Sequence, residues 1–460
     1  MKTLRWIIGA YAFASIVLFS ARSDAAVCAR PTDSSGYAGY KYAPVTPSSF
    51  DSAHVRIWYT TSGVHAVSTQ SSRSDGVPDD VVESAAVAEH AWTQYQAQGY
   101  RALPSDAETG CSGYGGDARL DVYLVDFGAA DGLTATEGCK AQGDAQVCAS
   151  FILAESNFAG RYATASVGIR TVLPHELFHA VQNAYDAELD RFWAEGTAQW
   201  AAKQLDPSLT DFESYLPSFF SQSSRAIDAP AGGVTAAVLY GSAIWPAFLS
   251  LQHGPDIIRQ TFEREAVSGG SSLLATDAAL LSAGSSLQEA FSLFGAWNAA
   301  TGERWGAGGY PNAETYPMVA VSEAPAGGSF SGQTSGLGTL YYRLHSDVAE
   351  RLSASADADR TSVFLLPLRD GRVDLSARKA LPTEYVGDAI LVVSGGTTSK
   401  TDARFTIERR AVLAAPASAP SDDTDSNGCA IGETGPPRTL SVFSVLALIC
   451  ARRRRAENAE

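Results

Sequence analysis

The feature that most constrains this chain is the pentapeptide HELFH at residues 175–179, set in an otherwise apolar stretch. Apolar residues recur at three- and four-residue spacing from about Val172 to Ala187, which predicts a helix. His175 and His179 would then lie one turn apart on one helix face, where two imidazoles can bind a single Zn²⁺. Glu176 lies one step round the helix, close enough to act as a base without being a ligand. A polar stripe on a surface helix is the alternative, and the apolar neighbours disfavour it.

A site with two histidines needs a third protein ligand. Gln182 and Tyr185 stand where a three-histidine site of the form HExxHxxGxxH requires Gly and His, which excludes that arrangement. Glu195, in the segment FWAEGTAQW, is the candidate carboxylate. Burying a carboxylate beside two tryptophans is costly unless a cation compensates its charge. Glu188 as the ligand, or a buried ion pair without a metal, are the alternatives.

Several neighbours could support such a site. Gly196 would let the two helices approach each other closely. Gln182, Asp186 and Gln199 are candidates for fixing the imidazole tautomers through hydrogen bonds.

The pair HELFHAVQ and WAEGTAQW resembles the gluzincin branch of zinc metallopeptidases. It resembles more closely the secreted metalloproteases of myxobacteria, in which HExxH precedes a W-x-x-EGTA helix. The resemblance covers residues 40–300 and implies a zincin-like α+β domain that hydrolyses peptide bonds with one catalytic Zn²⁺. It implies His175, His179 and Glu195 as metal ligands and Glu176 as the general base.

The same family has an aromatic-rich helix after the ligand glutamate, here VLYGSAIWPAFL, which makes Tyr240 the candidate oxyanion donor and His253 its rival. An extended protein or peptide substrate would pair with an edge strand, for which Val147–Ala154 is the candidate. The segment SSRSDGVPDD is similar to an acidic calcium loop. Because Ser72 and Ser74 stand where carboxylates are needed, a capped helix start is favoured over a Ca²⁺ site.

The first 25 residues resemble a secretory signal peptide. Lys2 and Arg5 precede the apolar stretch Trp6–Phe19, and the small residues Ser23 and Ala25 follow at cleavage-compatible positions. We expect cleavage after Ala25 and export of the chain.

The cysteine pattern agrees with export to an oxidising compartment. Four cysteines lie in the expected folded part, and an even number permits three pairings: Cys28, Cys111, Cys139 and Cys148. We favour Cys139 with Cys148, because this pair closes a hairpin-sized loop and leaves the other two together. No CxxC spacing occurs, which disfavours a zinc knuckle.

The C-terminal end has its own organisation. Residues 413–428 form an Ala/Pro/Ser/Asp linker that cannot build a core. In residues 429–460, Cys429, a short apolar run and Arg452–Arg455 follow, and the run is shorter than the roughly 20 residues that span a bilayer. This arrangement resembles the C-terminal sorting tail of myxobacterial surface proteins and implies retention at the outer cell surface. A tail helix with a basic cap is the alternative.

The segment pattern predicts two folded domains. Residues 26–309 alternate strand-like and helix-like segments, which predicts an α+β domain. The strand candidates are His54–Thr61, Arg119–Phe127 and Val147–Ala154, and the further helix candidates are Pro78–Gln98, Phe192–Leu205, Val238–Gln252, Ile257–Glu265 and Ser286–Ala299. In residues 310–412, turn-rich segments separate short apolar stretches, which predicts a small all-β sandwich as an accessory domain.

The overall charge narrows the function classes. With 34 Lys and Arg against 50 Asp and Glu the chain carries a formal charge of −16, which disfavours nucleic-acid binding. We expect a monomer, with membrane contact only through the tail before its processing. Two classes remain open: an exported zinc endopeptidase, or a surface binding protein with an inactive peptidase fold. The intact Glu176 favours the first, because an inactive protein has no use for that base.

Overall fold

The computed structural model describes residues 28–109, 116–128, 130–357, 360–396 and 402–412. Packing divides the chain into one unit up to Val412 and a second from Leu413, and all described residues belong to the first. The expected signal peptide, Cys111, the linker and the tail lie outside the described residues. Within the described part, no helix has the length and apolar character needed to cross a membrane.

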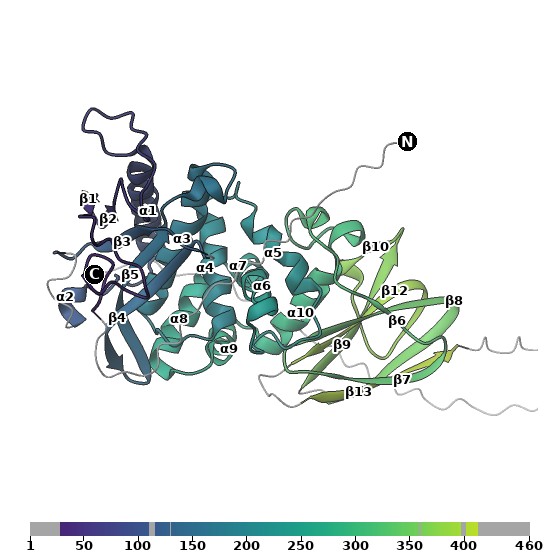
Figure 1. Ribbon diagram of the computed structural model, residues 1–460. Coiled ribbons are helices and arrows are strands. Elements are labelled where there is room, and N and C mark those ends of the chain that lie inside the picture. The colour runs from purple at the N-terminus through teal and green to yellow at the C-terminus, as the bar shows by residue number, and fades with distance from the viewer. Residues whose placement is uncertain (1–27, 110–115, 129, 358–359, 397–401, 413–460) are drawn as a thin grey trace, which may run out of the picture. The chain divides into compact units, whose positions relative to one another are not determined.

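The N-terminal part is an α+β arrangement built on one five-stranded sheet (Figure 1). The strand order is β1-β2-β3-β5-β4, with β2, β3 and β5 parallel and the two outer strands antiparallel to their neighbours. The strands are β1 Ser48–Asp51, β2 Val55–Tyr59, β3 Leu120–Val125, β4 Gly132–Gln142 and β5 Ala145–Glu155. The three predicted strands are thereby confirmed as β2, β3 and β5.

Helices pack against this sheet and continue beyond it. They are α1 Asp79–Ala97, α2 Asp106–Thr109, α3 Ala165–Asn183, α4 Arg191–Leu205, α5 Asp211–Phe220, α6 Ala237–Gly241, α7 Ile244–His253, α8 Asp256–Ser268, α9 Ser272–Ser282 and α10 Leu287–Ala299. The prediction of one helix over Val238–Gln252 is wrong, because the helix is interrupted between α6 and α7. Pro246 explains the break, since a proline has no N–H for the carbonyl of Ser242 and its ring crowds that carbonyl.

The two sheet faces pack into different cores, because successive strand residues point to opposite sides. Val122 and Ile152 belong to the large core shared with α1, α3 and α4. Tyr123 and Phe151 point the other way, into a smaller core covered by the N-terminal segment around Tyr42. Helix α3 therefore packs directly on one face of the sheet.

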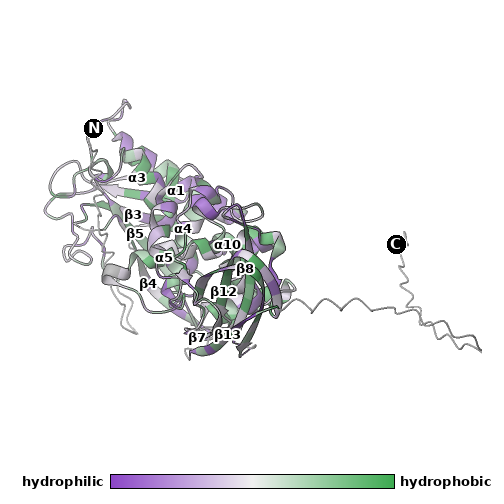
Figure 2. Cartoon of the chain, turned by 90° about the vertical axis from the view of Figure 1, so that its right-hand side faces the viewer, coloured by the Kyte–Doolittle hydropathy of each residue, from purple (hydrophilic) through white to green (hydrophobic). Residues whose placement is uncertain are grey.

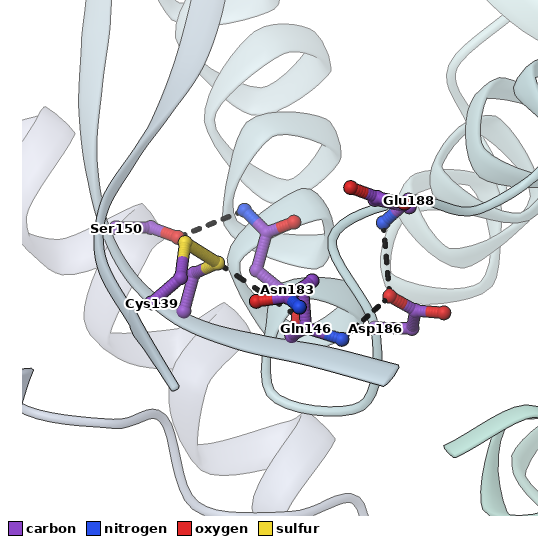
Figure 3. Close-up of a disulfide and its surroundings, with 7 residues drawn as sticks. Cys139, Gln146, Ser150, Asn183, Asp186 and Glu188 are labelled. Carbon is purple, nitrogen blue, oxygen red and sulfur yellow. Dashed lines mark hydrogen bonds between the residues drawn. A yellow bond between two sulfur atoms is a disulfide. The ribbon is translucent and has the colours of Figure 1, made fainter. Parts of the chain in front are cut away.

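The edge of the sheet differs from the prediction. The strand expected at Val147–Ala154 is β5, which lies between β3 and β4 and is not an edge strand. The edge strand on that side is β4, which the sequence did not predict. The expected disulfide between Cys139 and Cys148 is confirmed and joins β4 to β5 (Figure 3). Cys28 is also disulfide-bonded, and its expected partner Cys111 lies outside the described residues.

The C-terminal part is all-β, as the sequence predicts. Its strands are β6 Ser322–Glu323, β7 Gly328–Thr334, β8 Thr339–Ala356, β9 Thr361–Arg369, β10 Arg372–Val373, β11 Lys379–Ala380, β12 Thr383–Gly395 and β13 Ala403–Ala411. They belong to one hydrogen-bonded sheet of order β10-β9-β12-β8-β13-β7, with β11 beside β9 and β6 beside β8, rather than to two separate sheets. Figure 2 shows the hydrophobic colour along β12, whose Leu391 and Val393 lie in a core enclosed by this sheet.

The two parts share a core. Strand β12 also contributes Ile390 and Val392 to the large helical core, on the side that packs against α10. Gly295 of α10 permits this close packing, since a Cβ there would lie 2.8 Å from Ser394 Oγ. The Tyr341 hydroxyl donates a hydrogen bond of 3.1 Å to the Gly295 carbonyl. The predicted boundary between residues 309 and 310 therefore crosses a continuous apolar interior.

Candidate metal centre

Helix α3 carries the HELFH motif and is anchored at its start and in its middle. Thr164 caps its N-terminus, accepting a hydrogen bond of 3.2 Å from the Val167 amide, which is why the helix begins before the predicted residue. Pro174 lies inside the helix, and its carbonyl accepts a hydrogen bond of 3.0 Å from the Tyr95 hydroxyl of α1. Leu173 and Phe178 are fully buried in the large core. The helix is therefore held rigidly behind the two histidines.

Glu195 lies on helix α4, which packs against α3 and places this residue beside the two histidines. Trp193 and Trp200 are buried, as the motif suggested. Gly196 does permit a close approach, but not the predicted one to α3: a Cβ there would lie 2.6 Å from Ser242 Oγ. Ser242 begins the link between α6 and α7, and its hydroxyl donates to the Phe192 carbonyl at 2.7 Å. The glycine therefore seats α4 against that link.

The three expected ligands converge. Glu195 Oε2 lies 3.4 Å from His175 Nε2 and 3.6 Å from His179 Nε2, and the two nitrogens lie 3.1 Å apart. Ligand atoms about 2.0–2.1 Å from a tetrahedral Zn²⁺ are roughly 3.3 Å from one another. The side chains of the three residues are 10 to 18% exposed, so solvent reaches the group. The spacing fits one shared zinc ion.

The tautomer of His179 is fixed by Gln182. The Gln182 amide nitrogen donates to the Ala194 carbonyl and to Thr197 Oγ1, both at 2.8 Å. Its oxygen therefore faces His179 Nδ1 at 2.8 Å and can only accept. Nδ1 must carry the hydrogen, and this leaves Nε2 with the lone pair that a metal needs.

His175 is fixed in the same way by Gln199. The Gln199 amide nitrogen donates to Asp211 Oδ2, so its oxygen accepts from His175 Nδ1 at 3.1 Å. When both imidazoles are neutral, two lone pairs and a carboxylate thus face one another with no donor between them. Glu195 Oε2 is buried and has no hydrogen-bond partner within the described part of the chain. Such a group of acceptors requires a cation.

The pKa values of His179 and Glu195 also indicate that this group attracts positive charge. Burial alone would lower the pKa of His179, but the adjacent carboxylate of Glu195 outweighs burial and raises this pKa to about 9. Burial would raise the pKa of Glu195, and the two imidazoles overcome it and lower this pKa well below its usual range. A proton held by His179 or a dication can supply the positive charge, and a dication does so for all three ligands.

Glu176 lies beside the group but is not one of its three members. Its side chain is buried, and Oε2 lies 2.7 Å from the hydroxyl of Thr134 on β4. Its charge contributes to raising the pKa of His179, so the carboxylate lies within electrostatic reach of the group.

Tyr240 approaches the site from α6. Its ring centroid lies 6.0 Å from that of His175 and 5.0 Å from that of Tyr215, on which it stacks. The rival His253 ends α7 and has no hydrogen bond or ion pair with the three ligands within the described residues.

Two other candidates lie elsewhere. Glu188, the rival ligand, is exposed in the loop between α3 and α4. Asp186 does not contact the imidazoles, since its carboxylate accepts hydrogen bonds from the amides of Gln146 and Glu188 (Figure 3). It ties the loop to β5.

The calcium-like segment leads into α1, but the expected side-chain cap is absent, because the N-cap residue is Pro78 and no side chain caps the first turn. Asp79 Oδ1 accepts hydrogen bonds of 2.8 Å from both the amide and the hydroxyl of Ser72. Arg73 pairs with Asp75 in the same turn. Within the described chain, no group of three potential metal ligands gathers here.

Sequence reasoning missed Thr134, Thr197 and Asp211. Thr197 belongs to the EGTA segment, and its one-turn offset from Trp193 could have identified it as an inward-facing residue. Thr134 and Asp211 lie on a strand and a helix that were not predicted, and no local pattern links them to the motif.

The comparisons add little to this geometry. No family model and no curated protein matches the chain. Among solved structures, the periplasmic inhibitors of g-type lysozyme from Salmonella Typhimurium and Aeromonas hydrophila are 14% and 9% identical to it. Each match covers 20% of this chain and 98% or 97% of the inhibitor, with a TM-score of 0.15. A mutant of the Escherichia coli inhibitor is 12% identical over the same 20% of this chain and 97% of its own, also with a TM-score of 0.15.

Proposed function

We propose that this chain is an exported zinc-dependent endopeptidase. One observation carries the proposal: three acceptor atoms of His175, His179 and Glu195 face one another at zinc-ligand spacing, while Glu176 stays free of the group. Both imidazole tautomers have their metal-binding nitrogen turned inward. The partial exposure of the ligands suits a site that substrates reach, since a structural zinc site is closed.

The chemistry follows from the residues present. Zinc, when bound, polarises a carbonyl and makes water more acidic. Glu176 takes the proton from the attacking water and passes it to the leaving amine. Tyr240 is the proposed donor to the developing oxyanion, for which a comparable donor contributes about 2.7–4 kcal/mol. The outer edge of β4 offers backbone groups to an extended peptide.

Fold class and location belong to the same proposal. The α+β part would be a zincin-like domain of the gluzincin type, related to the secreted metalloproteases of myxobacteria, and the all-β part an accessory region. The proposed signal peptide and C-terminal sorting tail would carry the chain to the outer cell surface. The Cys139–Cys148 disulfide supports an oxidising compartment.

The test combines metal analysis with proteolysis of casein. We expect one zinc per purified chain, and loss of hydrolysis on chelation with recovery when zinc is returned. Glu176→Ala should keep the zinc and lose the activity, whereas Glu195→Ala should lose both. Glu188→Ala is the matched control and should change neither, because this carboxylate is exposed and remote from the ligands.

Two outcomes would contradict the proposal. Undiminished hydrolysis by Glu176→Ala would remove the assigned base. A wild-type chain that binds zinc but cleaves no protein would favour the other class, an inactive peptidase fold that binds a surface partner.

A further inference from the structure

Strand β4 passes unusually close to Glu176 at its first residue. A Cβ on Gly132 would lie 2.6 Å from Glu176 Oε1 and 2.8 Å from the Val172 side chain. Real Cβ atoms essentially never come so near, so only glycine fits here without a shift. The strand backbone therefore borders the carboxylate of the proposed base.

Two residues further on, the same strand face presents a hydroxyl to that carboxylate. Thr134 Oγ1 lies 2.7 Å from Glu176 Oε2 and also 2.7 Å from the main-chain oxygen of Glu176. A threonine hydroxyl has one hydrogen to donate and two lone pairs that accept. It therefore has two equidistant acceptors and one proton to share between them.

We propose that Thr134 is a positioning residue that holds the side chain of Glu176 in place beside strand β4. This inference rests on the proposed function, in which Glu176 is the general base. Because the Thr134 hydroxyl lies at hydrogen-bond distance from both Oε2 and the main-chain oxygen of Glu176, it ties the carboxylate to the strand and to the backbone of its own helix. The side chain of Glu176 is thereby restricted to one orientation.

Strand β4 is held in place by contacts on both sides of Thr134, so it can present the hydroxyl in a fixed position. Asp131, which precedes Gly132, accepts hydrogen bonds from Arg161 at 2.5 Å and from Tyr162 at 3.0 Å. Thr134 pairs with Ile152 of β5, so its side chain points to the face that packs on α3. A β-branched residue has few rotamers to choose from. The hydroxyl is thus presented from a rigid element at a set angle.

The experiment compares substitutions on one strand. Thr134→Val removes the hydroxyl and keeps the shape, Thr134→Ala is a second hydroxyl-free variant, and Thr134→Ser restores the hydroxyl. Thr136→Val is the matched control: Thr136 lies on the same strand face and makes no side-chain hydrogen bond within the described residues. Each variant is measured for zinc content, melting temperature, and kcat and KM with a peptide substrate.

We expect Thr134→Val and Thr134→Ala to keep zinc and to lose about 10- to 100-fold in kcat, because a misplaced catalytic group costs about that much. KM should change little, since Thr134 holds the base and not the substrate. Thr134→Ser should recover most of the loss, and Thr136→Val should match the wild type. Equal kcat in Thr134→Val and Thr136→Val would overturn the inference, as would a Thr134→Ser variant as slow as Thr134→Ala.

A second readout separates this inference from the proposed function. In crystal structures of the isolated proteins, Glu176 should occupy one conformer beside Thr134 in the wild type and move in Thr134→Val. If the wild type hydrolyses nothing, the proposed function fails and this comparison alone decides the positioning role. A Glu176 side chain that stays in place without the hydroxyl refutes it.

Discussion

Single side chains determine the charge of the site, and His179 is the clearest case. In the metal-free protein its pKa is raised to about 9 against the cost of burial, because Glu195 lies beside it. At neutral pH the imidazole therefore holds a proton on the nitrogen that a metal must use. A metal and a proton would therefore compete for the same atom, Nε2 of His179.

This competition predicts proton release on zinc binding. At pH 7 the binding of one zinc should release about one proton from His179, since pH 7 lies below the pKa of about 9. Raising the pH toward 9 should strengthen apparent affinity by about tenfold per unit, and lowering it should weaken affinity equally. Calorimetric titration in two buffers of different ionisation enthalpy measures the count. Binding heats that do not depend on the buffer would contradict the prediction.

At the residue scale, the sequence predicted that His175, His179 and Glu195 would come together, because a helix repeats every 3.6 residues and a short loop returns the chain. It could not predict how the glutamines are oriented. The direction of the Gln182 amide depends on the carbonyl of Ala194 and the hydroxyl of Thr197, which reach it only once α3 and α4 have docked. Such information lies in the packing of elements and not in any one segment.

At the scale of elements, Arg30 joins three parts of the fold. Its guanidinium pairs with Asp106 of α2 at 2.8 Å, with Glu137 of β4 at 2.6 Å and with Asp121 of β3. All four side chains are buried. Burial raises the pKa of Glu137 to about 7 although Arg30 opposes it. One cation thus stabilises carboxylates that come from separate elements.

Replacing Arg30 should therefore destabilise the fold in a pH-dependent way. Arg30→Met should lower the free energy of unfolding by about 3–5 kcal/mol, because it leaves buried carboxylates without a cation. Without Arg30 the pKa of Glu137 rises further above its unfolded value, so the folded state keeps a proton that the unfolded state releases. Stability should then fall as pH rises from 5 to 8.

Urea unfolding at both pH values measures this effect. Arg73→Met is the control, because Arg73 pairs with Asp75 at the exposed surface and should matter little. A loss of stability that is equal for the two variants, or larger at pH 5, would contradict the prediction.

The elements that the sequence missed have a common cause. The strand β4, GLTATEGCKAQ, contains two glycines and few β-branched or aromatic residues, so its strand propensity is low. Pairing with β5 and the Cys139–Cys148 bond hold it in place. By contrast α1, α4 and α10 were predicted almost to their ends, because their apolar periodicity is local information.

At the scale of the whole molecule, the described chain has an interior that does not stop at the predicted domain boundary. Phe364 and Leu366 of β9 lie in the same apolar core as α7 and α10. The composition change near residue 310 correctly marked a change from helices to strands. It did not mark a separation of cores, because composition does not record which surfaces pack together.

Truncation tests this continuity. A chain of residues 26–309 should melt at a lower temperature than a chain of residues 26–412, or precipitate, since it exposes apolar surface of α10 that β9 and β12 cover. Differential scanning calorimetry of the two chains provides the comparison. A shorter chain that melts as the longer one does would show that the two parts fold independently.

The contact between Gly132 and Glu176 also defines a signature that other genomes can be searched for. Chains that share this site should carry Gly-x-Thr upstream of HExxH, with the threonine 42 residues before the glutamate in this protein. Any side chain at the glycine position would displace the glutamate. We therefore expect glycine to be required at this position of the strand. A tripeptide and a pentapeptide that lie far apart in the chain thus form one combined sequence signature.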